Sequence, residues 1–166
     1  MRVYMSIEPR LMSLSLNPPL SLLAAYQKVY PTQSPSWIVQ APGRETWIAA
    51  SLVSESDGYT LTSGNLNAQA KFTRRSALLK RTVTNRPIPS WARYAAGVVV
   101  LMSEAGLIVP GVMVVSSSED TSFGPRHDHA LGMAFAALWY DLCQQPYTPE
   151  QVFDWAEKAR RQYVEN

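Results

Sequence analysis

The chain has 166 residues, of which 46% are hydrophobic and 17% are charged, and its formal net charge at pH 7 is +2. This length suits one domain with a buried core, and such a small net charge excludes a protein that binds nucleic acid through overall basicity. We expect a single domain over residues 1–166, with residues 1–20 as an irregular extension.

The chain gives no indication of export or membrane insertion. Cys143 is the only cysteine, so neither an intrachain disulfide nor a thiolate metal cluster can form. No apolar run approaches the roughly 20 residues of a transmembrane helix, and Asn17, Pro18 and Pro19 interrupt the segment that would resemble a signal peptide. We expect a cytoplasmic protein whose partners include neither nucleic acid nor a membrane, with Cys143 in the core.

The first half of the chain reads as one helix followed by strands. Apolar residues at helical spacing predict a helix over 21–31, which ends at a proline. Threonine, aromatic and β-branched residues then predict strands at 36–43, 44–55, 57–64, 67–75 and 77–85. In the stretch 71–81, basic residues alternate with other residues, which favours the solvated face of a β-hairpin. The alternative for this stretch is a patch that binds a phosphate backbone.

The second half predicts helices around one further strand, 110–118. Ser90 and Gly106 bound a helical pattern as N-cap and C-terminal glycine. The stretch 129–146 is apolar almost all round, as in a buried helix, and Thr148 is the expected N-cap of a last helix. The economical architecture is an α+β fold in which helices pack against one mostly antiparallel sheet.

Three stretches resemble galactokinase, a member of the GHMP family of small-molecule kinases. In chain order they are YPTQSPSWIVQAPGRETWI, WARYAAGVVVLMSEAGLIVPGVMVV and HALGMAFAALWYDLCQQPYTPEQVFDWAEKARRQYV. The resemblance runs from residue 21 to the end, and APGR is its one distinctive short motif. It implies a sheet with helices packed on one side, a shape shared with a ribosomal-protein domain. It also implies the N-terminal half of a two-domain enzyme that transfers phosphate from Mg-ATP to a sugar.

The segment after APGR departs from the family, whose acidic residues there hold the sugar hydroxyls. Arg44 is kept, but Ala50 and Ser51 stand where the resemblance places glutamate and histidine, and Val53 stands near the position of an aspartate. The side chains of alanine and valine cannot accept hydrogen bonds, so we expect the carboxylate clamp to be absent. A shifted register that brings an acid of the segment 55–57 to this place is the alternative. Arg44 is left for a phosphate, a surface ion pair or a cap.

The junction between the strand 110–118 and the next helix also departs from the family, which has a glycine-rich phosphate loop there. The matching positions here are Asp120, Ser122, Gly124, Pro125, Arg126, His127 and Asp128. Gly124 alone remains of the glycine pair, and Pro125 has no N–H to offer a phosphate. Asp120 and Asp128 add negative charge, and a like pair about 4 Å apart costs roughly 4 kcal/mol at an effective dielectric near 20. We expect the loop not to hold ATP, with Arg126 offsetting part of that charge and Asp128 serving as N-cap.

The sequence HDH, which contains His127 and His129, raises a metal hypothesis. Residues two apart on a helix do not face each other, and the chain has no HExxH pattern. We therefore expect a polar loop and no metal site, and keep a metal-dependent activity at His127 and His129 as an alternative.

The chain ends at Asn166, just before the segment that the resemblance says supplies the catalytic aspartate and the second domain. We therefore expect no catalytic residue and no cofactor, in a galactokinase-like domain that is inactive on its own and acts as a binding domain. One alternative is half of a split ATP-dependent sugar kinase, completed by another chain and using Mg-ATP. We expect a second copy or a partner protein on the face that the C-terminal kinase domain normally covers.

Overall fold

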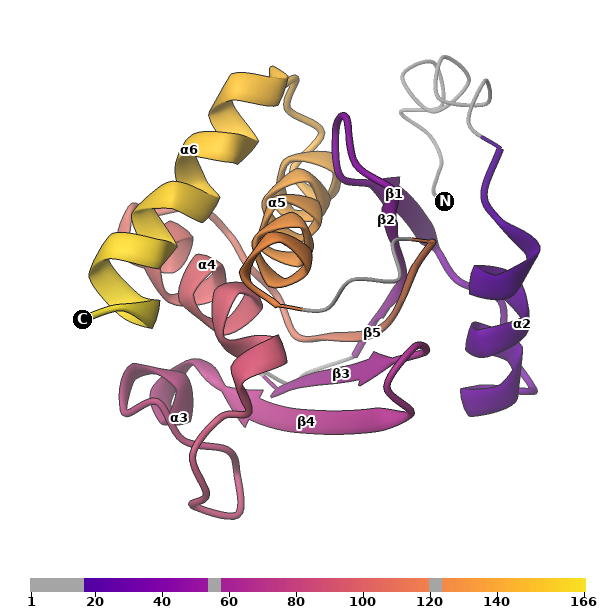
Figure 1. Cartoon of the computed structure of the whole chain (residues 1–166), viewed down its shortest axis with the longest axis horizontal. Coiled ribbons are helices and arrows are strands. Elements are labelled where there is room, and N and C mark those ends of the chain that lie inside the picture. The colour runs from indigo at the N-terminus through magenta and orange to yellow at the C-terminus, as the bar shows by residue number, and fades with distance from the viewer. Residues whose placement is uncertain (1–16, 54–57, 120–123) are drawn as a thin grey trace.

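The computed structural model describes residues 17–53, 58–119 and 124–166 (Figure 1). The strands are β1 (Trp37–Gln40), β2 (Thr46–Leu52), β3 (Gly58–Ser63), β4 (Ala68–Thr73) and β5 (Val112–Ser118). The helices are α2 (Leu20–Val29), α3 (Arg74–Leu78), α4 (Arg93–Glu104), α5 (Pro125–Leu142) and α6 (Pro149–Ala159). A 3₁₀ turn, η2 (Ser90–Ala92), precedes α4, and a π-helical turn, η3 (Arg160–Val164), continues α6.

The five strands form one sheet in the order β1-β2-β5-β3-β4. The pairs β1–β2, β2–β5 and β3–β4 are antiparallel, and β3 runs parallel to β5. The central strand is thus the last one in the sequence, and its Val114 lies between Ala50 of β2 and Leu61 of β3. The prediction of a mostly antiparallel sheet is confirmed.

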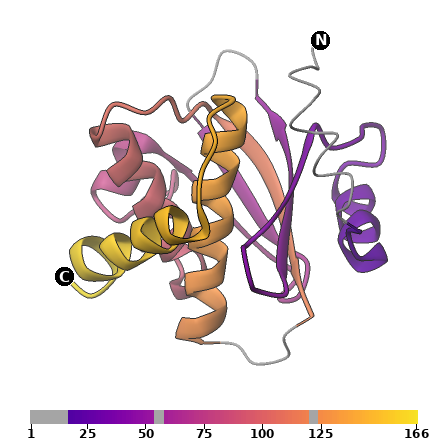
Figure 2. The same cartoon turned by 90° about the horizontal axis from the view of Figure 1, so that it is seen from above.

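The helices lie on both faces of this sheet but unequally. Figure 2 shows α4, α5 and α6 together on one side and α2 alone on the other. Alternate strand residues divide accordingly, because successive side chains of a strand point to opposite faces. Ile48, Ala50 and Val114 belong to the core under the three helices, whereas Trp47 and Val115 pack with α2. The predicted helical layer on one side is confirmed, and α2 adds a small second layer.

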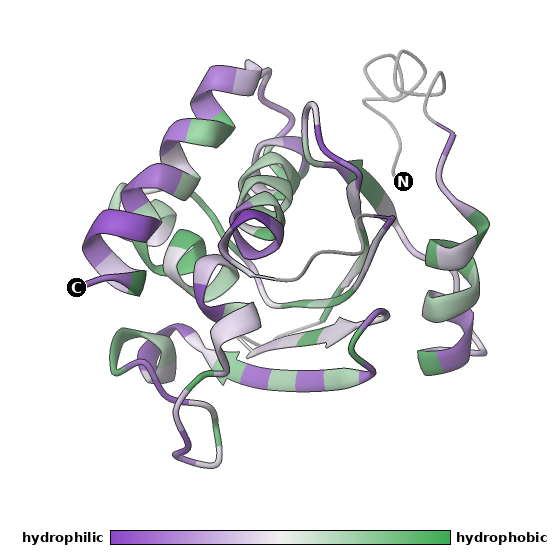
Figure 3. Ribbon diagram, viewed as in Figure 1, coloured by the Kyte–Doolittle hydropathy of each residue, from purple (hydrophilic) through white to green (hydrophobic). Residues whose placement is uncertain are grey.

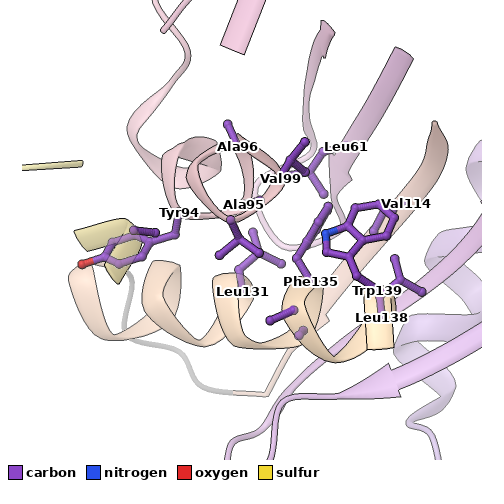
Figure 4. Close-up of a cluster of buried hydrophobic side chains, with 14 of the residues drawn as sticks. Leu61, Tyr94, Ala95, Ala96, Val99, Val114, Leu131, Phe135, Leu138 and Trp139 are labelled. Atoms are coloured by element: carbon purple, nitrogen blue, oxygen red, sulfur yellow. The ribbon is translucent and has the colours of Figure 1, made fainter. Parts of the chain in front are cut away.

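The core is centred on α5, which lies between the sheet and α4. Figure 4 shows Leu131, Phe135 and Trp139 of α5 facing residues of α4, together with Leu61 of β3 and Val114 of β5. The rings of Phe135 and Trp139 meet edge to face with centroids 6.0 Å apart. This burial explains why the sequence of α5 is apolar almost all round. In the part of the chain that is described, no helix has the length and apolar character needed to cross a membrane.

Two expectations about residues at the helix ends were wrong, and two were right. Cys143 is half-buried, not in the core, because α5 ends at Leu142 and leaves it at the C-cap. Ser90 is not an N-cap, since it begins the η2 turn after Pro89 and α4 starts later. Gly106 has φ +93° after α4, and Thr148 forms a capping box with Gln151, so both predicted ends are confirmed.

The strand expected at 77–85 is not formed. β4 ends at Thr73, whose hydroxyl accepts a hydrogen bond from the Ser76 N–H at 3.0 Å while the Ser76 hydroxyl accepts one from the Thr73 N–H at 2.9 Å. This reciprocal cap starts α3 and turns the chain away from the sheet. The alternation visible along β4 in Figure 3 therefore stops there, and of the basic residues in 71–81 only Lys71 lies on a strand.

The C-terminal turn η3 is anchored on the body of the domain. Tyr163 is 5% exposed, and its hydroxyl donates to the Ala77 carbonyl at 2.5 Å. Its ring lies against Gly97 of α4, where an added Cβ would approach the ring atoms to 3.0 Å. Burial raises the pKa of the Tyr163 hydroxyl to about 12. Gly97 thus gives η3 the room it needs to pack on α4.

Candidate functional site

Ala50 and Ser51, the two central positions that the resemblance assigns to a sugar clamp, lie on opposite faces of β2. Ala50 has no exposed surface and belongs to the core under α4 and α5. Ser51 is 5% exposed, and its hydroxyl lies 2.6 Å from the Tyr26 hydroxyl of α2, on the other side of the sheet. Neighbouring residues of a regular strand cannot converge on one ligand. The structure therefore uses both positions for packing between the sheet and its helices.

The other two predicted sugar positions flank β2 at its two ends. Val53 follows the strand, where its N–H donates to the Gly111 carbonyl at 3.0 Å. Arg44 precedes the strand, in the turn after β1, and Gly43 makes that turn with φ +72°. The seven residues of β2 span about 20 Å at roughly 3.3 Å per residue. Arg44 and Val53 are thus not brought together, and the four positions form no common pocket.

Arg44 does lie close to the start of α5. Its backbone is fixed by a hydrogen bond from its N–H to the Ala41 carbonyl at 3.0 Å and by the Gln40 amide, which donates to the Arg44 carbonyl at 2.7 Å. Among the described residues the guanidinium has neither an ion pair nor a hydrogen bond, and its positive charge contributes to lowering the pKa of His129. The APGR turn therefore presents, beside the second turn of α5, a cation that has no partner among the described residues.

The first turn of α5 differs from what the sequence predicted. Gly124 is the N-cap, with φ +134° and ψ −164°, a conformation that essentially only glycine adopts. Pro125 occupies the first helical position, and no side chain within the described part of the chain caps the helix. Asp128 is not the N-cap, because its own N–H already donates to the Gly124 carbonyl at 3.0 Å. Asp120 and Ser122 lie outside the described residues, and Arg126 is exposed.

His127 and His129 are both buried and have different partners. Nδ1 of His127 lies 3.2 Å from Oδ1 of Asp128. Nε2 of His129 lies 2.8 Å from Oε2 of Glu157 on α6. No group of three potential metal ligands occurs in the residues that the structure describes. The two histidines therefore have separate carboxylate partners, and the contact of His129 joins α5 to α6.

Glu157 joins His129 to the end of α6. Its other carboxylate oxygen accepts two hydrogen bonds from Arg160, at 2.9 and 3.1 Å, and these bonds are the main cause of the lowered pKa of Glu157. The pKa of His129 is lowered mainly by burial, although its bond to Glu157 acts in the opposite direction. Arg160 also donates to Glu165 at 2.9 Å. The network joins α5, α6 and the C-terminal turn η3 through hydrogen bonds.

A cluster of hydroxyl groups, which was not predicted from the sequence, lies at the end of β5. Thr46 donates to the Ser118 hydroxyl at 3.2 Å, and the side-chain amide of Asn65 forms two hydrogen bonds of 2.8 Å with the backbone of Ser118. The only hint was the run of serines 116–118. The cluster is uncharged, and no hydrogen bond between a serine and a histidine joins the described residues. Its hydroxyl and amide groups can offer hydrogen bonds to a ligand.

No family model and no curated protein matches the chain. Solved structures do match. The galactokinase of Lactococcus lactis in complex with galactose superposes with a TM-score of 0.63 and 16% identity, over 89% of this chain and 43% of that one. A mevalonate kinase from Methanococcus jannaschii superposes with a TM-score of 0.51 and 10% identity, over 70% of this chain and 36% of that one. A second mevalonate kinase superposes with a TM-score of 0.52 and 12% identity, over 77% of this chain and 45% of that one.

These matches confirm the fold that the sequence resemblance implied. Their identities are so low that they demonstrate the fold alone, which is that of one part of a GHMP kinase. The chain spans less than half the length of each of these kinase chains.

Proposed function

We propose that this chain is a galactokinase-like domain that does not transfer phosphate on its own and acts by binding. Its premise is the fold that the chain shares with galactokinase and mevalonate kinase. The observation that carries the proposal is the burial of the two central positions that the resemblance assigns to a sugar clamp. Ala50 is sealed in the core, and the Ser51 hydroxyl is hydrogen-bonded to Tyr26 on the opposite face. Neither position offers a carboxylate or a free polar group to a sugar.

The start of α5 supports the same conclusion for Mg-ATP. Phosphoryl transfer depends on cations and backbone N–H groups that offset the phosphate charge. Here Pro125 removes one N–H, Asp128 adds a carboxylate in the first turn, and Gly124 is the only glycine of the junction. Arg44 and Arg126 supply positive charge nearby, but neither restores the lost backbone donors. The described residues thus do not fit a triphosphate cradle, and we assign no step to Mg-ATP.

A binding role leaves open what is bound. We propose that a second copy or a partner protein covers the face that a C-terminal kinase domain covers in the two-domain enzymes. The alternative is half of a split ATP-dependent sugar kinase, which requires another chain to supply the missing groups. A metal-dependent activity at His127 and His129 finds less support, because each histidine already has its own carboxylate partner.

The test is thermal unfolding of the chain with Mg-ATP, Mg-ADP and galactose, singly and combined, alongside an assay for phosphorylated galactose. A ligand at 100 times its dissociation constant would stabilise the domain by about 2.7 kcal/mol. We expect no shift and no product, with a complete two-domain galactokinase measured in parallel as the positive control. A nucleotide-dependent shift would overturn the proposal in favour of a split kinase.

Sedimentation velocity tests the partner half of the proposal. We expect the mass of the sedimenting species to rise with protein concentration, or a partner to co-sediment. A chain that remains a monomer at the highest concentration and captures no partner would contradict it.

A further inference from the structure

Residues 71–86, which we call the basic projection, carry an unusual concentration of positive charge. They comprise the end of β4, α3 and the loop that hangs below the body of the domain in Figure 1. Between Gly58 and Ser103 the sequence has no acidic residue, whereas the rest of the chain carries all thirteen acids. The cations of the projection are Lys71, Arg74, Arg75, Lys80, Arg81 and Arg86. A chain of net charge +2 thus concentrates its positive charge in one place.

Most of these cations are available to a ligand. All ion pairs of the described residues involve His127, His129 or Arg160, so none involves the basic projection. Arg81 makes one contact within the basic projection, since its guanidinium donates to the Asn85 carbonyl at 3.3 Å. Lys80 is the member that is tied to the body of the domain, because its ammonium donates to the Asn166 carbonyl at 2.8 Å and lies over the Tyr163 ring. The other five side chains are exposed. Their charge therefore acts on whatever approaches from solvent.

The basic projection also exposes aliphatic side chains. Leu78 is 55% exposed, Leu79 is 70% exposed and Val83 is 54% exposed. Such groups are common singly on surfaces, but three of them among arginines on one short segment are not explained by packing within the domain. Apolar side chains interleaved with cations match a surface that is anionic outside and apolar beneath.

Hydrogen bonds hold the basic projection in one shape. The Arg81 N–H donates to the Ser76 carbonyl at 2.8 Å, which closes the turn after α3. The Val83 N–H donates to the Lys71 carbonyl at 3.0 Å, which ties the loop to the edge strand β4. An isolated bridge joins Arg81 to Pro87. The cations and aliphatic groups are thus presented together by a loop whose shape these hydrogen bonds fix.

We propose, in place of the expectation that no membrane is a partner, that the basic projection binds the surface of a membrane rich in anionic lipid. Cations near such a surface each strengthen binding about fivefold, and exposed leucines add affinity by entering the interface. Nucleic acid fits less well, because no aromatic residue lies between Phe72 and Trp91 to stack on bases and the leucines would stay in water. A protein partner would need a cavity shaped to a convex loop, whereas a lipid surface adapts to it. This inference does not rest on the proposed function.

The experiment is co-sedimentation with vesicles of phosphatidylcholine alone or with about 30% phosphatidylserine. The whole chain is used, in about 0.1 M and about 0.5 M NaCl. We expect binding only to the phosphatidylserine vesicles and only at the lower salt. Replacing both Arg75→Gln and Arg86→Gln should lower the partition coefficient about 25-fold, and Leu79→Ser should lower it about tenfold.

Matched controls lie elsewhere on the surface. Arg161→Gln removes an exposed arginine of η3, and Leu20→Ser removes a leucine of α2 that is 82% exposed. Both should bind like the parent chain, and unfolding curves should show that all the variants are folded. The proposal is overturned if the parent chain ignores phosphatidylserine vesicles at low salt, or if the controls lose binding as strongly. Binding to duplex DNA without binding to vesicles would also overturn it.

Discussion

Introducing by Ala50→Glu the acid that the galactokinase resemblance places at this position should disrupt the fold without creating a sugar site. Ala50 is fully buried, faces α4 and α5, and lies between Val114 of β5 and Trp37 of β1. A glutamate there adds a methylene and a carboxyl group to a packed core. If the position instead retained access to a ligand, the carboxylate would remain hydrated and the cost would be small.

The expected cost has two parts. Overpacking a core position costs about 1–3 kcal/mol. Burial raises the pKa of the new carboxyl in the folded state, and a rise of about 3 units corresponds to roughly 4 kcal/mol once the unfolded chain is ionised. Because this folded pKa lies above the unfolded value of about 4.3, the loss is smallest below that pH and grows as the pH rises. We expect a total near 5 kcal/mol at neutral pH.

Urea unfolding of Ala50→Glu at about pH 4.5 and pH 8 measures both parts. The control is Leu52→Glu on the same strand, because Leu52 is 47% exposed and a surface substitution should change stability by less than about 0.5 kcal/mol. Thermal unfolding with galactose then tests for a regained site. The reasoning fails if Ala50→Glu is as stable as the parent chain at pH 8, or if galactose stabilises it.

Three further predictions concern contacts that hold the domain together. Gly97→Ala should destabilise it by about 1–2 kcal/mol, because the clash with Tyr163 outweighs the better helix propensity of alanine; equal or greater stability in urea would contradict this. Ser51→Ala should cost about 1–3 kcal/mol, since it leaves the buried Tyr26 hydroxyl without that partner, and an unchanged urea midpoint would be the opposing result. The lowered pKa of His129 means that the folded state resists protonation, so stability should fall as the pH drops below about 6.5; the lowered pKa of Glu157 extends this loss to lower pH. The measurement is the melting temperature as a function of pH. His129→Gln should flatten this profile near pH 6.5, and an unaltered profile would refute the role given to His129.

Local patterns predicted the helices well. The periodicity of α2, α5 and α6 and the cap at Thr148 depend on residues within a few positions of each other, so one sequence suffices to recognise them. The failures were local as well. The Thr73 and Ser76 pair is a capping box, but the basic alternation that precedes it favoured a continued strand. Asp128 satisfied the preference for an acid near a helix start, yet Gly124 and Pro125 set that start earlier.

The candidate site was less predictable, because its geometry depends on residues far apart in the chain. The resemblance to galactokinase placed Ala50 and Ser51 at positions of a sugar clamp. Only the sheet shows that Ala50 faces α5 and that Ser51 faces Tyr26 of α2. The contact of His129 with Glu157 joins two helices, and the bonds of Asn65 to Ser118 join a hairpin to the central strand. Neither contact leaves a short-range signal in the sequence.

The position of β5 in the sheet has a consequence for how the chain folds. The hairpins β1–β2 and β3–β4 are local and can pair early, yet they meet only through β5, which begins about sixty residues after β2 ends. Non-local pairing of this kind is slow, because a long loop must close before any contact forms. Until β5 arrives, β2 and β3 each present an unsatisfied edge that can pair with another chain. During synthesis the domain therefore passes through an aggregation-prone stage that lasts until residue 118 has left the ribosome.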